Sequence, residues 1–217
     1  VYPKFAALMP KTSLEKIIVA PFADFVPPSP EVFLFRDLIN SKEKPPAITV
    51  DPKEDVALLQ YTGGTTGTPK GVMLTHLNLI ANATQIAGFA RTTADDIFFS
   101  AIPFFHVYGM TTSMNIPIMI GATFIPFPFP RDFEGMIKAI ARYRPTMFFA
   151  VPTMYAAINS FPGVEQYDLT SIRLCVSGGA PLPDNVRDTF ERLTGCKMRE
   201  ALGMTEATTV CSCSPCV

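Results

Sequence analysis

Residues 61–71 read Tyr-Thr-Gly-Gly-Thr-Thr-Gly-Thr-Pro-Lys-Gly, so three glycines and four threonines precede a lysine. Glycine costs backbone entropy on folding and adds no side chain to a core, which makes this segment a poor packing element. Its peptide N–H groups and hydroxyls can converge on phosphate oxygens, while Lys70 adds a positive charge. The segment therefore predicts a phosphate-binding loop, and a flexible glycine-threonine turn is the alternative.

The spacing in this loop differs from that of the P-loop of classical NTPases. That motif places Lys and then Ser or Thr directly after its second glycine, and a helix follows at once. Here Thr68 and Pro69 separate Gly67 from Lys70, and the apolar run Val72–Leu74 comes next. We therefore expect a strand, the loop, a second strand and only then a helix, which argues against a classical NTPase.

Three later segments also combine glycine with polar or charged side chains. They are Pro103–Gly109 (PFFHVYG), Ser177–Pro181 (SGGAP) and Leu202–Glu206 (LGMTE). Together with Thr62–Lys70, and in this order, they resemble the motifs of the adenylate-forming superfamily of acyl-CoA synthetases, luciferases and nonribosomal peptide adenylation domains. The glycine pair of the loop and the Pro103–Gly109 segment are most similar to long-chain fatty acid–CoA ligases.

This resemblance implies an ATP-dependent acid–thiol ligase that forms an acyl-adenylate and then a thioester. Its ligands would be ATP, Mg²⁺, coenzyme A and a fatty acid, with no nucleic acid. A ligase for another acid, whether aryl, medium-chain or amino acid, is one alternative. A nucleotide- or acyl-binding module without turnover is the other.

The resemblance also assigns candidate site residues. The nucleotide site would comprise Thr62, Gly63, Gly64, Thr65, Thr66, Gly67, Lys70, Gly178, Gly179, Ala180, Pro181, Leu202, Gly203, Met204 and Thr205. The catalytic candidates are Lys70, His106, Thr205 and Glu206, and the candidate Mg²⁺ ligands are Glu206 and Thr62. Many relatives carry an aromatic residue where Leu202 stands, and leucine lacks the quadrupolar component of stacking on a purine.

The chemistry of acyl adenylation suits these residue types. A carboxylate attacks the α-phosphorus of ATP, so the site must neutralise negative charge and align two anions. Mg²⁺ keeps several waters, and one protein carboxylate such as Glu206 is therefore sufficient. The plain alternatives are a solvated Lys70, a surface Glu206, a tight turn at Ser177–Pro181 and a core histidine at position 106.

Strand-like apolar runs alternate with helical patterns along the chain. The predicted strands are Ile17–Ala20, Val56–Tyr61, Val72–Leu74, Ile97–Ile102, Ala122–Ile125, Thr146–Val151, Ile172–Val176 and Lys197–Ala201. The predicted helices carry Leu77, Ile80 and Ala87 behind an N-cap at Thr75, then Met136, Ile137, Ile140 and Tyr143, then Val186, Phe190 and Leu193 before Gly195. This alternation predicts an α/β fold with largely parallel sheets and packed helices.

Two stretches have unusual composition. Phe25–Pro52 contains six prolines and is expected to be a surface excursion or linker. Ile97–Pro130 contains no Lys, Arg, Asp or Glu, but its prolines interrupt it too often for a membrane-spanning helix. We expect two buried strands, Ile97–Ile102 and Ala122–Phe127, joined by an apolar helix. They would wall an acyl channel entered near His106 and Met110, unless Met110 fills core.

The composition bounds the remaining possibilities. A net charge of −1 over 217 residues gives no general attraction to nucleic acid or an anionic membrane. Five cysteines without an apparent signal peptide favour a reducing compartment, so we expect a cytoplasmic protein, with peripheral association with the inner face of the membrane as an alternative. Cys211, Cys213 and Cys216 are expected to be buried or incidental thiols rather than zinc ligands.

The domain expectation follows from the resemblance. Residues 1–217 would be part of the large N-terminal, AMP-binding domain. The start of that domain and the C-terminal domain with the catalytic lysine would lie outside the chain.

Overall fold

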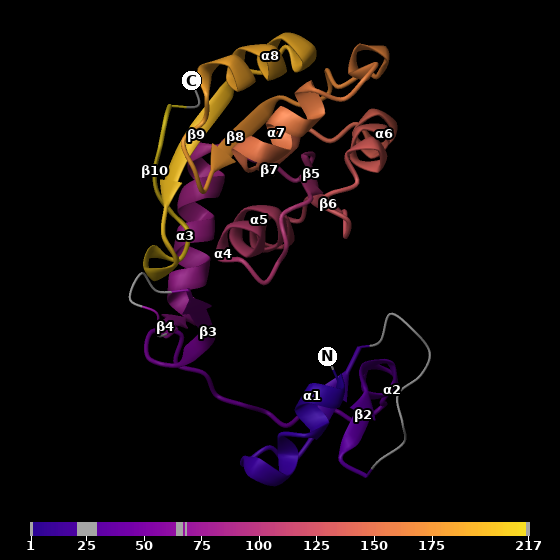
Figure 1. Ribbon diagram of the computed structural model, residues 1–217. Helices are drawn as coiled ribbons and strands as arrows, with labels where there is room; N and C mark the ends of the chain where they lie inside the picture. Colours follow the sequence, from indigo (N-terminus) through magenta and orange to yellow (C-terminus); the bar gives the residue numbers. More distant parts are fainter. Residues whose placement is uncertain (1, 21–29, 64–66, 68, 216–217) are drawn as a thin grey trace. The chain divides into compact units, whose positions relative to one another are not determined.

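The computed structural model describes residues 2–20, 30–63, 67 and 69–215. The chain divides into two compact units, Val1–Thr49 and Val50–Val217, which are drawn in Figure 1. None of the helices in the described ranges combines the length and apolar character that crossing a membrane requires.

The first unit is small. Its elements are α1 (Tyr2–Ala6), η1 (Met9–Lys11), β1 (Ile17–Val19), β2 (Val32–Leu34) and α2 (Phe35–Ile39), and β1 pairs in parallel with β2. The predicted strand at Ile17–Ala20 is confirmed. The segment Phe25–Pro52, predicted to be a surface excursion or linker, contains β2 and α2, neither of which has a buried residue, and residues 25–29 lie outside the described residues.

The second unit is built on a six-stranded sheet. Its strands are β5 (Ile97–Ser100), β6 (Thr123–Pro126), β7 (Met147–Ala150), β8 (Leu174–Gly178), β9 (Met198–Gly203) and β10 (Val210–Cys213). They lie in the order β10-β9-β8-β7-β5-β6, and all neighbours are parallel except β9 and β10. The predicted α/β fold with a largely parallel sheet is confirmed.

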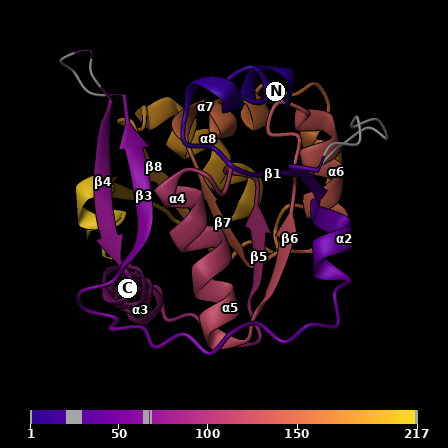
Figure 2. The same ribbon diagram turned by 90° about the horizontal axis from the view of Figure 1, so that it is seen from below.

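Helices cover both faces of this sheet. One face packs against α3 (His76–Phe89), α4 (Val107–Met110), η2 (Thr111–Asn115) and α5 (Ile116–Ile120). The other packs against α6 (Phe133–Tyr143), α7 (Pro152–Asn159) and α8 (Asp184–Thr194), and Figure 2 gives a second view of these layers. The short turns η3 (Val164–Gln166) and η4 (Thr205–Ala207) complete the unit.

The apolar strands follow from this double cover. In β5 the ring of Phe98 stacks on Phe149 of β7 on one face, with ring centroids 6.1 Å apart. The next residue, Phe99, meets Phe148 on the opposite face, with centroids 5.7 Å apart. Because successive side chains of a strand point to opposite faces, a strand buried on both sides must be apolar throughout.

A separate hairpin precedes α3. It consists of β3 (Val56–Thr62) and β4 (Lys70–Thr75), which pair antiparallel so that Thr62 lies opposite Lys70. The hydroxyl of Thr75 accepts the N–H of Asn78 at 3.2 Å, and the Asn78 side chain accepts the N–H of Thr75 at 2.9 Å. This reciprocal capping box starts α3 and confirms the predicted order of strand, loop, strand and helix.

The apolar helix predicted between β5 and β6 is present and contains a π-helical segment, η2, between α4 and α5. The N–H of Ile116 bonds to the carbonyl of Thr111, five residues earlier. Pro117 accounts for the irregularity, because a proline ring would clash with the carbonyl four residues before it, that of Ser113. That carbonyl instead accepts the hydroxyl of Ser100 at 2.7 Å.

Some predicted side chains are less buried than expected. Strand β6 is the last of the sheet, and its Thr123 and Pro126 are exposed, so the prediction of a second buried strand was wrong. Tyr143 is 47% exposed although Met136, Ile137 and Ile140 on the same helix are fully buried. On α3, Leu77 and Ile80 are largely exposed, and the buried side is formed by Asn82, Ala83, Ile86 and Ala87.

A buried carboxylate joins α3 to the strands that follow it. Asp96 is 4% exposed, and Arg173 grips both of its oxygens, with Nε–Oδ1 at 2.8 Å and Nη2–Oδ2 at 2.6 Å. The hydroxyl of Thr146 and the N–H of Thr93 also donate to it, at 2.7 and 2.9 Å. Burial raises the pKa of Asp96, but the hydrogen bonds from Arg173, Thr146 and Thr93 outweigh it, so the pKa lies below its usual value.

We expect Asp96→Asn to lower the free energy of unfolding by about 2 to 3 kcal/mol at pH 6, because charge-assisted hydrogen bonds are lost. The carboxylate stabilises the fold above its unfolded pKa of about 3.9, and this stabilisation is lost as the pH falls through the folded value. The difference in the free energy of unfolding between the wild type and Asp96→Asn should therefore shrink below about pH 4. Urea unfolding across pH tests this, with the exposed neighbour Asp95→Asn as control; equal losses in both variants would contradict it.

Candidate functional site

Three of the four sequence segments meet at one edge of the sheet. Pro103–Gly109, Ser177–Pro181 and Leu202–Glu206 lie at or just beyond the ends of β5, β8 and β9, and these strands run in the same direction. The carboxyl ends of parallel strands share one edge, which is where ligands bind in open α/β sheets. A cavity of about 210 Å³ lies there, lined among others by His106, Tyr108, Gly178, Gly179, Gly203 and Thr205.

Tyr108 fixes the α4 side of this cavity to the sheet. Its hydroxyl donates to the carbonyl of Val176 at 2.9 Å and lies 3.4 Å from that of Ala150. Burial, with the nearby thiols of Cys213 and Cys175, raises the pKa of Tyr108 far above its usual value, so the phenol stays a donor. A Cβ at Gly178 would lie 3.2 Å from the Tyr108 ring, so the glycine permits this close approach.

His106 is exposed, which rules out the alternative of a core histidine. Its Nδ1 accepts the N–H of Tyr108 at 3.1 Å and caps the N-terminus of α4. The ring is thereby oriented at the wall of the cavity, which Thr205 also lines. His106 and Thr205, predicted from separate segments, are brought to one place.

The turn that carries Glu206 is tightly closed. The N–H of Met204 bonds to the carbonyl of Thr209 at 2.9 Å. A Cβ at Gly203 would lie 1.9 Å from that carbonyl oxygen, so no other residue fits at position 203 without moving the backbone. The glycine of this segment is therefore required by the turn itself.

The carboxylate of Glu206 fits a Mg²⁺ ion shared with phosphate. It is exposed, and among the described residues it makes no ion pair. Within those residues no group of three or more His, Cys, Asp and Glu could hold a metal. A metal bound here would need oxygens from its substrate, which is the usual arrangement for Mg²⁺ at nucleotides.

The phosphate-loop segment approaches the same turn. Strand β4, which begins at Lys70, lies beside η4, which contains Thr205 and Glu206. Thr62 stands opposite Lys70 at the ends of the hairpin, Gly63 is exposed, and Gly67 has a left-handed φ of +87° that suits glycine. The predicted residues Gly64, Thr65 and Thr66 lie outside the described residues.

The segment Ser177–Pro181 and Leu202 border a further hollow. Gly179, Ala180, Pro181, Leu202 and Gly203 line it, and Leu202 is 69% exposed. An accessible apolar side chain opposite a glycine-containing backbone is a surface on which a flat ring can lie. The structure thus brings these predicted residues together around one space.

Glu200 borders this hollow too, and the sequence prediction missed it. Its Oε1 accepts the N–H of Leu182 at 3.0 Å, which ties the segment after Pro181 to β9. The only signal in the sequence was a charged residue two positions before the Leu202–Glu206 segment. That signal carries no information about a contact with a loop 18 residues away.

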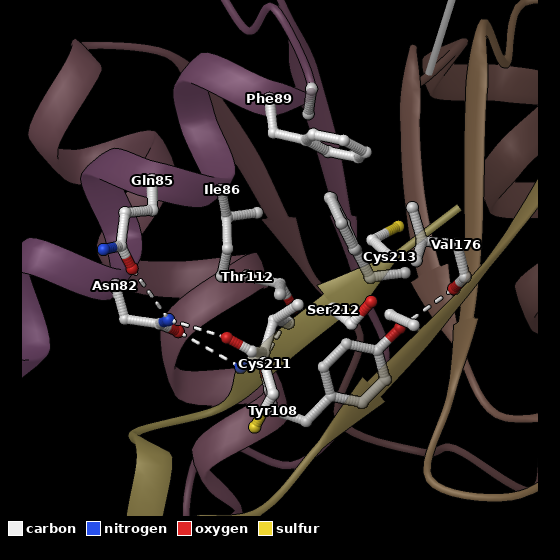
Figure 3. A pocket seen from close by; sticks show the side chains of 14 residues that line it. Asn82, Gln85, Ile86, Phe89, Tyr108, Thr112, Val176, Cys211, Ser212 and Cys213 are labelled. Atoms are coloured by element: carbon white, nitrogen blue, oxygen red, sulfur yellow. Dashed lines mark hydrogen bonds between the residues drawn. The ribbon is translucent and has the colours of Figure 1, made fainter. Parts of the chain in front are cut away.

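A larger cavity of about 450 Å³ lies between α3 and β10 (Figure 3). Its sides are formed by residues of the helix (Asn82, Gln85, Ile86, Phe89 and Ala90), of the sheet (Phe149, Val176 and Ala201) and of β10 (Val210, Cys211, Ser212 and Cys213). Of the uncharged stretch Ile97–Pro130, only Tyr108 and Thr112 line it. The stretch thus contributes two residues to this cavity, Met110 is not among its lining residues, and an acyl channel walled by the stretch stays a prediction.

Asn82 holds the two long walls of the larger cavity together. Its Nδ2 donates to the carbonyl of Val210 at 2.9 Å, and its Oδ1 accepts the N–H of Val210 at 3.2 Å (Figure 3). The pairing of β10 with β9 is irregular between Val210 and Ser212. Cys211 at this irregularity is exposed rather than buried, and Cys216 lies outside the described residues.

The two cavities are neighbours. Tyr108, Ala201 and Val210 line both the 210 Å³ cavity and the 450 Å³ cavity. A ligand with an apolar body in the larger space could therefore present its polar end to the smaller one, where the sequence segments converge.

The chain is similar to known proteins in both sequence and fold. Residues 6–216 match the model of a family described as AMP-binding enzyme. The chain is 44% identical over 164 residues to a long-chain-fatty-acid–CoA ligase of Bacillus subtilis, which covers 74% of this chain and 29% of that protein. The chain thus spans less than a third of the length of this curated relative.

Solved structures are similar as well. A long-chain-fatty-acid–CoA ligase from Archaeoglobus fulgidus superposes with a TM-score of 0.77 and 26% identity, over 99% of this chain and 43% of that one. An anthranilate–CoA ligase in complex with anthranoyl-AMP superposes with a TM-score of 0.71 and 29% identity, over 75% of this chain and 32% of that one. Since the family model spans nearly the whole sequence, the chain belongs to the family of AMP-binding enzymes.

Proposed function

We propose that this chain forms the nucleotide- and acid-binding part of a long-chain fatty acid–CoA ligase, within its N-terminal adenylate-forming domain. The observation that carries the proposal is the adjacency of the two cavities through Tyr108, Ala201 and Val210. A long acid would lie in the larger cavity with its carboxylate toward the smaller one. The name of the Bacillus subtilis relative and the acyl-AMP in the anthranilate–CoA ligase support this assignment.

The reaction proposed is acyl-adenylate formation followed by transfer to coenzyme A. A carboxylate oxygen attacks the α-phosphorus of ATP, the bond to the bridging oxygen breaks, and pyrophosphate leaves. The thiol of coenzyme A then loses its proton, its sulfur attacks the acyl carbon, and the bond to the AMP oxygen breaks so that AMP leaves. Both steps begin with negative groups in close contact, so charge neutralisation and alignment are the main tasks of the site.

The proposed roles follow the position of each residue. Lys70 and the loop from Thr62 bind the terminal phosphates, while Gly179–Pro181 and Leu202 enclose the adenine. Glu206, with Thr62, holds Mg²⁺, which supplies positive charge to the phosphates when bound. His106, oriented by its hydrogen bond to the Tyr108 N–H, borders the place of the acid carboxylate.

The larger cavity favours an apolar acid. Its helix and sheet sides are mostly aliphatic or aromatic, and a volume of about 450 Å³ is within the range of ordinary ligand sites. Burial contributes about 0.8 kcal/mol for each methylene, so affinity should rise with chain length until the cavity is filled. An aryl acid is the alternative, and comparing palmitate with benzoate distinguishes the two.

We expect Glu206→Gln to raise the Mg²⁺ concentration needed for binding of a non-hydrolysable ATP analogue by at least about tenfold, the lower range for loss of a metal-site partner. The amide keeps the volume of the side chain but removes its charge. Isothermal titration calorimetry at several Mg²⁺ concentrations measures this, and ATP–pyrophosphate exchange should fall in parallel. Glu165→Gln, an exposed carboxylate on η3, is the matched control. Equal Mg²⁺ dependence in both variants would reassign Glu206 to a surface role.

We also expect Ser212→Trp to weaken palmitate binding about tenfold, since excluding two methylenes costs about 1.6 kcal/mol. Ser212 lines the larger cavity and also the hollow beside Leu202, so affinity for the ATP analogue is measured as well, and a loss confined to that affinity would show that the indole blocks the nucleotide rather than the acid. Displacement of a fluorescent fatty acid provides the measurement. The exposed Ser160→Trp, after α7, controls for the added indole. Unchanged palmitate affinity in Ser212→Trp would place the acid elsewhere.

A further inference from the structure

We propose that Thr209 is a positioning residue that fixes the Glu206 turn to the helix carrying His106 at its N-cap. The inference rests on the proposed function, because it concerns the placement of the proposed Mg²⁺ ligand. Thr209 lies outside the Leu202–Glu206 segment, and nothing in the pattern of that segment points to it. Its role emerges from the contacts of its hydroxyl.

The hydroxyl of Thr209 bridges distant parts of the chain. The side chain is buried, and its Oγ1 lies 2.8 Å from the carbonyl oxygen of Val107 and 2.9 Å from Oγ1 of Thr111. Val107 is the first residue of α4, directly after His106, and Thr111 opens the π-helical segment. One hydroxyl therefore connects the turn to two successive turns of the helix.

The turn needs such an anchor because its own backbone is strained. Thr208 has a φ of +72°, a left-handed conformation that β-branched residues rarely adopt and that costs about 1 to 3 kcal/mol. The backbone closure from Met204 to Thr209 holds the ends of the turn together but does not attach it to α4. Within the described residues, no other side-chain hydrogen bond joins residues 204–209 to residues 107–120.

Removing the Thr209 hydroxyl affects its two partners differently. The carbonyl of Val107 also accepts the backbone N–H of Thr111, so it keeps a partner when the Thr209 hydroxyl is removed, whereas the buried Thr111 hydroxyl loses its hydrogen-bond partner among the described residues. Valine matches threonine in shape and lacks only the hydroxyl. The substitution Thr209→Val therefore releases the turn from the helix while keeping the packing, and Thr209→Ser keeps the hydroxyl while losing a methyl group.

The test compares both variants by calorimetric binding of a non-hydrolysable ATP analogue at several Mg²⁺ concentrations. We expect Thr209→Val to raise the half-saturating Mg²⁺ concentration about tenfold and Thr209→Ser to leave it within about twofold of the wild type. Fatty acid binding to the larger cavity should be the same in both. If the role of Thr209 were purely structural, Thr209→Val would lower the melting temperature and weaken fatty acid binding as well as raise the half-saturating Mg²⁺ concentration. That result would overturn the proposal.

The outcomes separate this inference from the proposed function. If Glu206→Gln changes the Mg²⁺ dependence and Thr209→Val does not, Thr209 has no positioning role and the proposed function stands. If Glu206→Gln has no effect, the proposed metal role fails regardless of Thr209. Should Thr209→Val not fold, Thr209→Ala takes its place against Thr209→Ser, and equal Mg²⁺ dependence in that pair would overturn the proposal.

Discussion

The carbonyl of Val176 is the point on which the architecture around the site depends. Tyr108 donates to it from α4 on one face of the sheet at 2.9 Å. On the opposite face the hydroxyl of Tyr155 in α7 lies 3.0 Å from it and 3.0 Å from the carbonyl of Phe148. Both phenols are buried, and burial raises their pKa values well above the usual range, so both remain donors. The strand just before Gly178 is thereby held from both sides, and with it the boundary between the two cavities.

A parallel sheet explains why the functional segments can be far apart in sequence. Each strand delivers its following loop to the same edge, so Gly178 and Gly203 become neighbours without any direct link between their loops. The antiparallel strand β10 has a different task, because it returns from the Glu206 turn and forms a wall of the larger cavity. Asn82 then connects that wall to α3. Polar side chains thus set the spacing of a largely apolar cavity.

Sequence patterns predicted the elements well and the contacts between them poorly. Apolar runs revealed strands β3 to β9; in β5, β7 and β8 the reason is burial on two faces, which requires apolar residues at successive positions. Helical periodicity predicted the buried side of α3 incorrectly. Leu77 and Ile80 are exposed, while the polar Asn82 is buried and bonds to the backbone of Val210. The motif segments predicted one site, but not the contacts of Glu200 with the Leu182 N–H or of Thr209 with the Val107 carbonyl and the Thr111 hydroxyl. No local pattern encodes such a partner.

The π-helical segment η2 constrains the number of residues in the helix that connects β5 to β6. Both ends of the helix are anchored, Tyr108 to the sheet and Ile116 in the core, and the wider turn between them accommodates one more residue than α-helical spacing would. Inserting a further residue at regular α-helical spacing would rotate one anchor relative to the other by about 100°. Homologous chains can therefore vary in length in their surface loops more easily than in this buried helix.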